Sequence, residues 1–192
     1  MRGGHALGVA TDCDGDSFGV IDAGSTFVAP NLVNALLLDY LRETRPHLPR
    51  KVGRSVATSH LVDAVVETPV GFEFLGELLA RGEIMLGGEE SGGLSILGHI
   101  PDKDGILASL LVVEMVARRG KPLRAMLDSL LAEVGPRVAS RRDLSLTEAA
   151  MERLMAAPLR RGFQRARDPA PARRGAGLLR HAVTVAVLAP RA

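Results

Sequence analysis

Three aspartates alternate in a short loop near the start of the chain, at Asp12, Asp14 and Asp16. Carboxylates this close repel one another unless a cation lies among them, and carboxylate oxygens are ligands that Mg²⁺ and Ca²⁺ prefer. Apolar stretches at residues 6–10 and 18–21 flank the loop and predict two strands joined by a turn. The spacing alone fits a metal site and an ordinary solvated turn about equally well, because aspartate and glycine are both common in turns.

An EF-hand is a poor alternative for this loop. The EF-hand pattern requires glycine at its sixth position and glutamate at its twelfth, where this chain has Ser17 and Ala23. Cys13 lies between two of the aspartates, but hard ions do not favour thiolates, so we interpret it as a spacer.

A second loop with possible chemistry spans residues 87–93 and directly follows an apolar stretch at residues 83–86. It carries Glu89, Glu90 and Ser91 between pairs of glycines, which let a backbone approach a ligand closely. Glutamate and serine side chains can bind neighbouring hydroxyl groups of a sugar. Taken alone, the loop is more simply explained as a surface loop with a solvated pair of glutamates.

Strands and helices alternate along most of the chain. Spacing of hydrophobic residues predicts strands at 6–10, 18–21, 51–58 and 83–86, and helices at 30–42, 61–66, 72–82, 102–118, 121–133 and 147–155. This alternation predicts a layered α/β domain over about residues 25–135. Beyond residue 155 the pattern decays into arginine, alanine, proline and glycine, with one possible lone strand at 181–188.

Composition limits the class of protein. A chain of 192 residues with 46% hydrophobic content supports a core, and 3% aromatics means that aliphatic side chains must build it. The single cysteine excludes an internal disulfide and favours a reducing compartment, so we expect a cytoplasmic protein. The start does not resemble a signal peptide, and no apolar stretch approaches the roughly 20 residues of a membrane span.

The charges are unevenly distributed. Residues 156–192 carry eight arginines and one acid, Asp168, whereas the rest of the chain has an excess of acids. Arginine outnumbers lysine 21 to 3, a bias that GC-rich coding explains better than nucleic-acid binding. The basic tail lacks the interleaved aromatic residues of a stacking surface, so we expect no specific nucleic-acid partner.

Four segments together resemble the α-D-phosphohexomutases, the phosphoglucomutases and phosphomannomutases. They are residues 10–16 (ATDCDGD), 68–72 (TPVGF), 88–93 (GEESGG) and 101–106 (PDKDGI), in the order and spacing of that family. The resemblance covers about residues 6–150. It implies an α/β/α domain with a mixed sheet, present here in incomplete form, followed by an irregular C-terminal tail.

The resemblance also implies an activity and a set of site residues. Family members move a phosphoryl group between the 1- and 6-positions of a hexose through a phosphoserine. By resemblance Asp12, Asp14 and Asp16 bind Mg²⁺, Glu89 and Ser91 contact the hydroxyls of a hexose phosphate, and Lys103 meets phosphate oxygens. The glutamate pair in the second loop favours glucose-type or broad-specificity members.

The chain departs from the family at several positions. Ser17 and Glu73 stand where members usually have basic residues. Between Val66 and Thr68 the chain is about ten residues shorter than the family, so we predict that the strand usually found there is missing. The resemblance implies that the phosphoserine belongs to an earlier domain, which we expect to be absent, so no catalytic residue is assigned. The tail, where the resemblance stops abruptly, suggests a frame-shifted translation.

These features predict three parts: residues 1–24 as the end of a preceding domain with the metal loop, 25–135 as the sugar-binding domain, and 136–192 as a linker and a degenerate or disordered remnant. We expect a truncated phosphohexomutase that is inactive alone. The alternatives are a non-catalytic module that binds Mg²⁺ and sugar phosphate, one piece of a split enzyme completed by a separate chain, or a partly folded pseudogene product.

Overall fold

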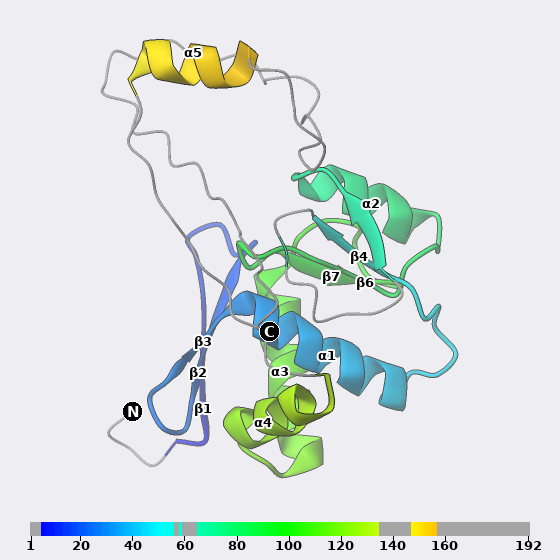
Figure 1. Ribbon diagram of the computed structural model, residues 1–192. Helices are drawn as coiled ribbons and strands as arrows, with labels where there is room; N and C mark the ends of the chain where they lie inside the picture. Colours follow the sequence, from blue (N-terminus) through cyan, green and yellow to red (C-terminus); the bar gives the residue numbers. More distant parts are fainter. Residues whose placement is uncertain (1–4, 56–57, 59–64, 135–146, 157–192) are drawn as a thin grey trace.

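The computed structural model describes residues 5–55, 58, 65–134 and 147–156. Its first three strands form an antiparallel sheet in the order β1 (Leu7–Thr11), β2 (Phe18–Asp22) and β3 (Phe27–Val28) (Figure 1). Thr11 pairs with Phe18, so the aspartate loop closes a hairpin between β1 and β2. The predicted pair of strands with a connecting turn is confirmed.

A second, mixed sheet lies on the other side of the central helices (Figure 1). Its strands, in spatial order, are β5 (Val65–Thr68), β4 (Val52–Ser55), β6 (Leu86–Gly88) and β7 (Leu94–Ile96). The first three run parallel and β7 is antiparallel to β6. The parallel strands therefore end at one common edge of the sheet.

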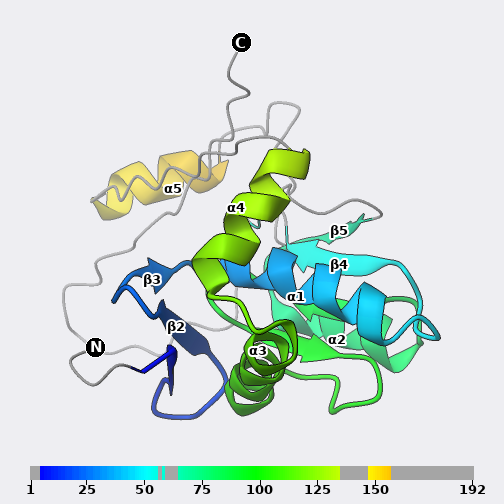
Figure 2. The ribbon, with the colours of Figure 1, turned by 90° about the horizontal axis from the view of Figure 1, so that it is seen from below.

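Helices cover both faces of the mixed sheet. The helices of the described residues are α1 (Pro30–Thr44), α2 (Phe72–Ala80), α3 (Gly105–Arg119), α4 (Leu123–Val134) and α5 (Glu148–Ala156). Helices α1 and α3 pack between the two sheets, while α2 packs on the opposite face of the mixed sheet (Figures 1 and 2). This arrangement confirms the predicted α/β/α layering with a mixed sheet.

The core follows these layers. The larger hydrophobic cluster joins α1, α3 and α4 to both sheets, and the smaller one lies beneath α2 and includes Phe72, Leu75, Leu79 and Ile84. Full burial of one leucine side chain stabilises the fold by about 2 kcal/mol relative to an exposed position. Aliphatic side chains build most of the core, as the composition predicts. Among the described residues, no helix is long and apolar enough to cross a bilayer.

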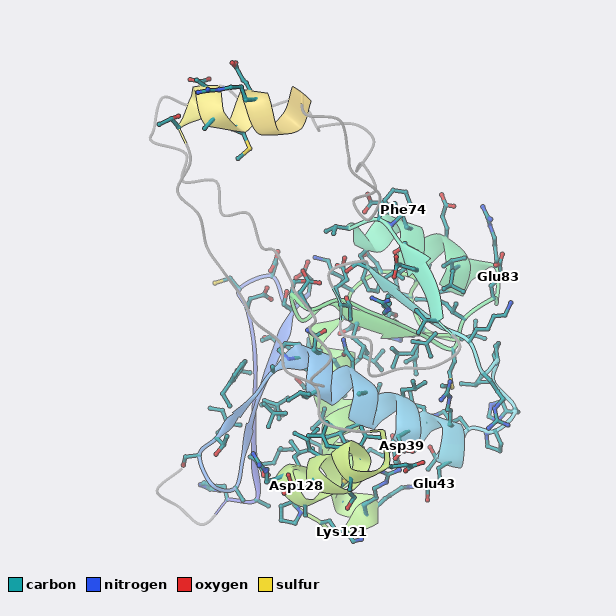
Figure 3. The ribbon with its side chains drawn as sticks, in the orientation of Figure 1. Asp39, Glu43, Phe74, Glu83, Lys121 and Asp128 are labelled. Carbon is teal, nitrogen blue, oxygen red and sulfur yellow. The ribbon has the colours of Figure 1, made fainter. Side chains whose placement is uncertain are left out.

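Polar contacts fasten α1 to α3 at the edge of this core. The Tyr40 hydroxyl donates a hydrogen bond to Glu114 at 2.6 Å. Arg119 lies over the Tyr40 ring and forms ion pairs with Asp39 and Glu43, both labelled in Figure 3. Because both of these carboxylates are exposed, we expect the ion pairs to add little stability beyond the packing.

One predicted element differs in type and another in position. Val65 and Val66, expected in a helix, lie in β5 and pair in parallel with Val52 and Gly53 of β4. A strand of β-branched residues thus lies at the place where we predicted a strand to be missing. The strand expected at residues 83–86 is also displaced, to Leu86–Gly88.

The start of α3 decides where Lys103 lies. The helix was expected to begin at residue 102, but Asp104 is its N-cap and accepts a hydrogen bond from the Leu107 backbone N–H at 2.8 Å. Asp102 and Lys103 therefore precede the helix. This leaves the Lys103 side chain outside the regular helical surface.

Some predictions fall outside the described residues. They concern Ser59, residues 61–64, most of the predicted tail and the lone strand at 181–188.

A buried carboxylate connects the hairpin sheet to α4. Asp22, at the end of β2, accepts hydrogen bonds from the backbone N–H groups of Leu123 at 3.1 Å and Arg124 at 2.9 Å. These N–H groups belong to the first turn of α4 and have no partner within the helix. Asp22 thus acts as an N-cap supplied from a distant part of the chain.

Replacing Asp22 with alanine should lower the free energy of unfolding by about 1–2 kcal/mol, because two helix N–H groups lose their acceptor. Urea denaturation followed by circular dichroism measures this change. Asp128→Ala is the matched control, since Asp128 is exposed and, within the described part of the chain, pairs with Arg124 of the same helix. Equal effects of the two substitutions would show that Asp22 does not cap the helix.

Candidate functional site

The aspartate loop brings three carboxylates together. Ligand oxygens of Asp12, Asp14 and Asp16 all lie within 4.8 Å of one another. The Ser17 backbone N–H donates to Asp12 Oδ1 at 3.1 Å, and this hydrogen bond lowers the pKa of Asp12. The Ser17 hydroxyl donates to Asp16 Oδ1 at 2.8 Å. Ser17 therefore holds the carboxylates of Asp12 and Asp16 in place.

The donor set of this loop fits a hard divalent cation. Three carboxylates at one point supply oxygen ligands and net negative charge, the combination that Mg²⁺ requires. The loop connects two antiparallel strands, not two helices, which agrees with the rejection of an EF-hand. Cys13 is exposed and free, in keeping with its interpretation as a spacer.

The glutamate loop lies at the carboxyl edge of the parallel strands. Strands β4, β5 and β6 end there at Ser55, Thr68 and Gly88, and Glu89 comes directly after β6. In open α/β sheets ligands commonly bind beyond this edge. The topology thus places Glu89 where a ligand site is expected.

Glu89 is a buried carboxylate with one anchored oxygen. Only 6% of the residue is exposed, and its Oε1 accepts a hydrogen bond from the Gly71 backbone N–H at 3.2 Å. Burial raises the pKa of Glu89, and the Gly71 hydrogen bond partly opposes that rise. Gly71 has φ of +133°, a backbone conformation that favours glycine. The turn at residues 68–71 therefore shapes the glutamate site.

A cavity of about 510 Å³ gathers the predicted substrate-binding residues. Glu89, Ser91 and Lys103 all line it, together with Glu73 and Glu90. Ser91 is exposed, and no hydrogen bond from its hydroxyl occurs in the described part of the chain. The structure thus brings together three residues that are separated by up to 14 positions in the sequence.

The two loops lie side by side. The Phe18 N–H donates to the Gly92 carbonyl at 3.1 Å, and Ser17 forms an antiparallel bridge with Gly93. The Gly105 N–H, at the start of α3, donates to the Gly15 carbonyl at 2.8 Å. Backbone hydrogen bonds therefore fix the aspartate loop against both the glutamate loop and α3.

Lys103 links the aspartate loop to the cavity. Its ammonium group forms an ion pair with Asp16, while the same residue lines the cavity beside Glu89. The hydrogen bond to Asp16 raises the pKa of Lys103. None of the three aspartates lines the cavity, so the ion pair of Lys103 with Asp16 connects the two parts of the site.

Sequence reasoning missed several residues that shape the glutamate loop. Asn34 on α1 is 4% exposed and donates to the Glu89 carbonyl at 3.3 Å. Glu90 accepts hydrogen bonds from the hydroxyls of Ser55 and Thr58. A polar residue on the apolar side of a predicted helix could have drawn attention to Asn34. No local pattern connects Glu90 to hydroxyls more than 30 positions earlier.

The described residues thus combine an α/β/α domain with an acidic hairpin loop and a cavity lined by glutamate, serine and lysine side chains. Residues 29–134, more than half of the chain, match the family described as phosphoglucomutase/phosphomannomutase, alpha/beta/alpha domain III. The chain belongs to this family, as the four sequence motifs predict. The predicted domain limits, 1–24, 25–135 and 136–192, stay a prediction.

Among curated relatives, the phosphoglucomutase of Komagataeibacter xylinus is 31% identical over 150 residues, which are 70% of this chain and 27% of the relative. Phosphoglucomutase 1 of Drosophila melanogaster is 33% identical over 138 residues, 66% of this chain and 24% of the relative. The chain therefore spans about a quarter of the length of these two relatives.

Solved structures agree with this assignment. A putative phosphomannomutase from Thermus thermophilus superposes with a TM-score of 0.66 at 36% identity, over 70% of this chain and 32% of that one. The open form of parafusin, a phosphoglucomutase from Paramecium, gives a TM-score of 0.70 at 27% identity, over 79% and 28%. The fold of the described residues is thus that of the family.

Proposed function

We propose that this chain supplies the cation-binding loop and the hexose-binding cavity of a phosphohexomutase, an isomerase of carbohydrate metabolism. The reaction would interconvert the 1- and 6-phosphates of a hexose. The observation that carries the proposal is Lys103, which pairs with Asp16 of the aspartate loop and lines the cavity that contains Glu89 and Ser91. A cation site and a sugar site are thereby adjacent, as phosphoryl transfer on a sugar requires.

The proposed cation is Mg²⁺, held by Asp12, Asp14 and Asp16. When bound, it would neutralise negative charge on the phosphoryl group that is transferred. The chain contributes carboxylates already brought within 4.8 Å of one another, so little rearrangement is needed to assemble the ligands.

Lys103 is suited to hold phosphate oxygens as a cation. Because Asp16 raises the pKa of Lys103, the side chain stays protonated at neutral pH. It can therefore stabilise an anionic ligand but does not act as a general base. Its position between the aspartate loop and the cavity suits a phosphate group that lies between the cation and the sugar.

Glu89 and Ser91 are suited to bind sugar hydroxyls. The Gly71 N–H occupies Glu89 Oε1, which leaves the second carboxylate oxygen for a ligand hydroxyl. The Ser91 hydroxyl can donate or accept a hydrogen bond. A charged acceptor and a hydroxyl on one cavity wall match the neighbouring hydroxyls of a hexose. Preference for glucose-type substrates remains a prediction from the glutamate pair.

Isothermal titration calorimetry tests the proposal directly. The chain should bind Mg²⁺, and glucose 1,6-bisphosphate should bind at least tenfold more tightly with Mg²⁺ than without it. Replacing Asp12, Asp14 and Asp16 together by asparagine should abolish the Mg²⁺ signal, whereas Asp128→Asn, on an exposed face of α4, should retain it. If neither Mg²⁺ nor glucose 1,6-bisphosphate bound to the chain, the proposal would be contradicted.

Turnover is a separate expectation. Since the chain spans about a quarter of its curated relatives, we expect mutase activity only when the remaining parts of such an enzyme are joined to it or supplied by another chain in the cytoplasm. Binding of both Mg²⁺ and sugar bisphosphate, with no turnover when the remaining parts are supplied, would favour the alternative function, a non-catalytic module that binds Mg²⁺ and sugar phosphate.

A further inference from the structure

We propose that Glu90 is a positioning residue that fastens the glutamate loop, residues 88–93, to the end of β4 through Ser55 and Thr58. On this inference, which rests on the proposed hexose site, Glu90 does not bind the sugar. Its carboxylate instead fixes the place at which Glu89 and Ser91 meet the ligand.

The contacts of Glu90 support this role. Its Oε2 accepts a hydrogen bond from the Ser55 hydroxyl at 3.2 Å and one from the Thr58 hydroxyl at 3.4 Å. The two hydroxyl oxygens also lie 2.9 Å apart, so either proton can turn from Glu90 to the neighbouring hydroxyl. Ser55 is fully buried and Thr58 is 6% exposed, so water does not easily replace either donor. One oxygen of Glu90 is thus committed to the protein.

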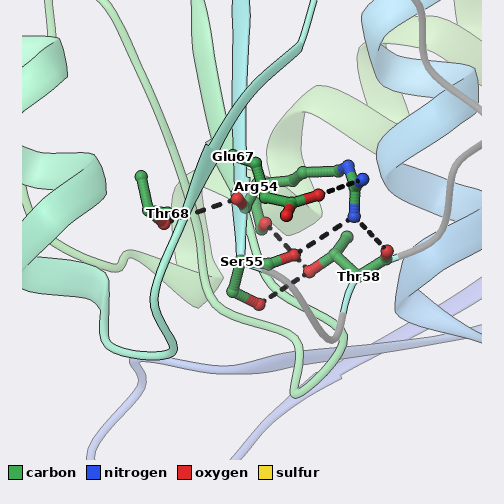
Figure 4. A network of polar contacts seen from close by, with 6 residues as sticks. Arg54, Ser55, Thr58, Glu67 and Thr68 are labelled. Carbon is green, nitrogen blue, oxygen red and sulfur yellow. Dashed lines mark hydrogen bonds and ion pairs between the residues drawn. The ribbon is translucent and has the colours of Figure 1, made fainter. Parts of the chain in front are cut away.

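The two hydroxyls are themselves held by a buried network. The Arg54 guanidinium donates to the Thr58 carbonyl at 2.7 Å and pairs with Glu67 of the neighbouring strand at 2.6 Å (Figure 4). The Thr58 N–H donates to the Ser55 carbonyl at 3.0 Å. Figure 4 shows these groups gathered at the end of β4. The surface that receives Glu90 is therefore fixed before any ligand binds.

Other contacts hold the loop on either side of Glu90. Asn34 donates to the Glu89 carbonyl, and Gly88 lies so close to α1 that a Cβ there would be 2.7 Å from Asn34 Nδ2. The Gly92 carbonyl accepts the Phe18 N–H at 3.1 Å. With the backbone and Glu90 fixed, one Glu89 oxygen and the Ser91 hydroxyl are left to face the cavity. The two adjacent glutamates therefore have different proposed roles: Glu89 meets the ligand, and Glu90 positions the loop.

Two substitutions of Glu90 separate positioning from direct sugar binding. Glutamine keeps an oxygen that accepts both hydroxyls, so Glu90→Gln should bind glucose 1,6-bisphosphate within threefold of the original chain. Leucine removes the acceptor, so Glu90→Leu should bind at least tenfold more weakly. Glu83→Leu, at an exposed residue outside the cavity, is the matched control and should not weaken binding. A loss in Glu90→Gln equal to that in Glu90→Leu would overturn the inference.

A double-mutant cycle tests whether Ser55 acts through Glu90. Ser55→Ala should weaken ligand binding in the original chain and should have no further effect in Glu90→Leu. Ser55→Thr, which keeps a hydroxyl, should restore binding. Additive losses from Ser55→Ala and Glu90→Leu would contradict the proposed connection.

Hydrogen exchange separates this inference from the proposed function. The Gly92 N–H donates to the Glu89 carbonyl at 3.2 Å inside the loop. Its exchange should become at least tenfold faster in Glu90→Leu than in Glu90→Gln, with no ligand present. Unchanged exchange would refute the positioning role even if the sugar binds. Faster exchange in a chain that binds no sugar would contradict only the proposed function.

Discussion

Replacing Gly105 with alanine should lower the free energy of unfolding by about 3 kcal/mol, because the added methyl group has no space. A Cβ at this position would overlap the Ser17 carbonyl oxygen and lie 2.9 Å from the Gly15 carbonyl oxygen. Both are backbone atoms, which cannot rotate away as a side chain can. Relief requires that the aspartate loop move away from α3, so Mg²⁺ binding should also weaken at least tenfold.

Gly24→Ala is the matched control for Gly105→Ala. A Cβ at Gly24 would come no closer than 3.7 Å, to the Thr26 hydroxyl, and we expect stability within about 0.5 kcal/mol of the original chain. Urea denaturation and Mg²⁺ titration measure both effects. Normal Mg²⁺ affinity in Gly105→Ala would show that contact with α3 does not hold the aspartate loop in place.

The elements with strong periodicity were predictable from sequence. The helix at Pro30–Thr44 and the strand at Phe18–Asp22 both lie within two residues of their expected limits. The failures are short strands whose stability comes from their neighbours. Val65 and Val66 fit the apolar face of a helix as well as a strand, and pairing with β4 decides between them.

The sequence motifs single out residues that meet in one cavity, but the contacts that support them were not predictable; the roles of these residues stay a prediction. Motif spacing led to Glu89, Ser91 and Lys103, which line one cavity. The Lys103–Asp16 ion pair joins the aspartate loop to the segment just before α3, which begins at Gly105 and not at residue 102. Contacts of this kind depend on how distant segments pack, and a single sequence does not report that packing.

The role of Asp22 in the fold could not be predicted from the sequence either. A carboxylate at the end of a strand predicts a solvated turn, since aspartate favours turns. In the structure it is 4% exposed and caps a helix that begins about 100 residues later, at Leu123. Its role follows from the packing of α4 against the hairpin sheet, which brings the free N–H groups of the helix to the carboxylate.

Glu89→Gln should have opposite effects on stability and on ligand binding. Burial raises the pKa of Glu89 above its ordinary value of 4.5, so the folded chain binds this proton more tightly than the unfolded chain does. The stabilising effect of the proton is therefore present at low pH and is lost as pH rises from about 4.5 through the folded pKa. At pH 7 the buried charge opposes folding, and an uncharged glutamine removes that cost.

The melting temperature of Glu89→Gln should accordingly exceed that of the original chain at pH 7, and the difference should shrink as pH falls toward 4.5. The glutamine oxygen can still accept the Gly71 N–H, so the local backbone is kept. Differential scanning calorimetry across this pH range measures the change. A lower melting temperature at pH 7 would show that the carboxylate is stabilised by its surroundings and not strained by burial.

Ligand binding should change in the opposite direction, by about 100-fold toward weaker affinity, because a charged acceptor is lost. With the glutamine oxygen bound to Gly71, its NH₂ group faces the cavity where a sugar hydroxyl needs an acceptor. Glu83→Gln, which removes a charge at an exposed position outside the cavity, should leave stability and affinity nearly unchanged. If Glu89 had a purely structural role, its substitution would lower stability and affinity together or change neither. A carboxylate that lowers stability at neutral pH but is needed for affinity is therefore explained by ligand binding.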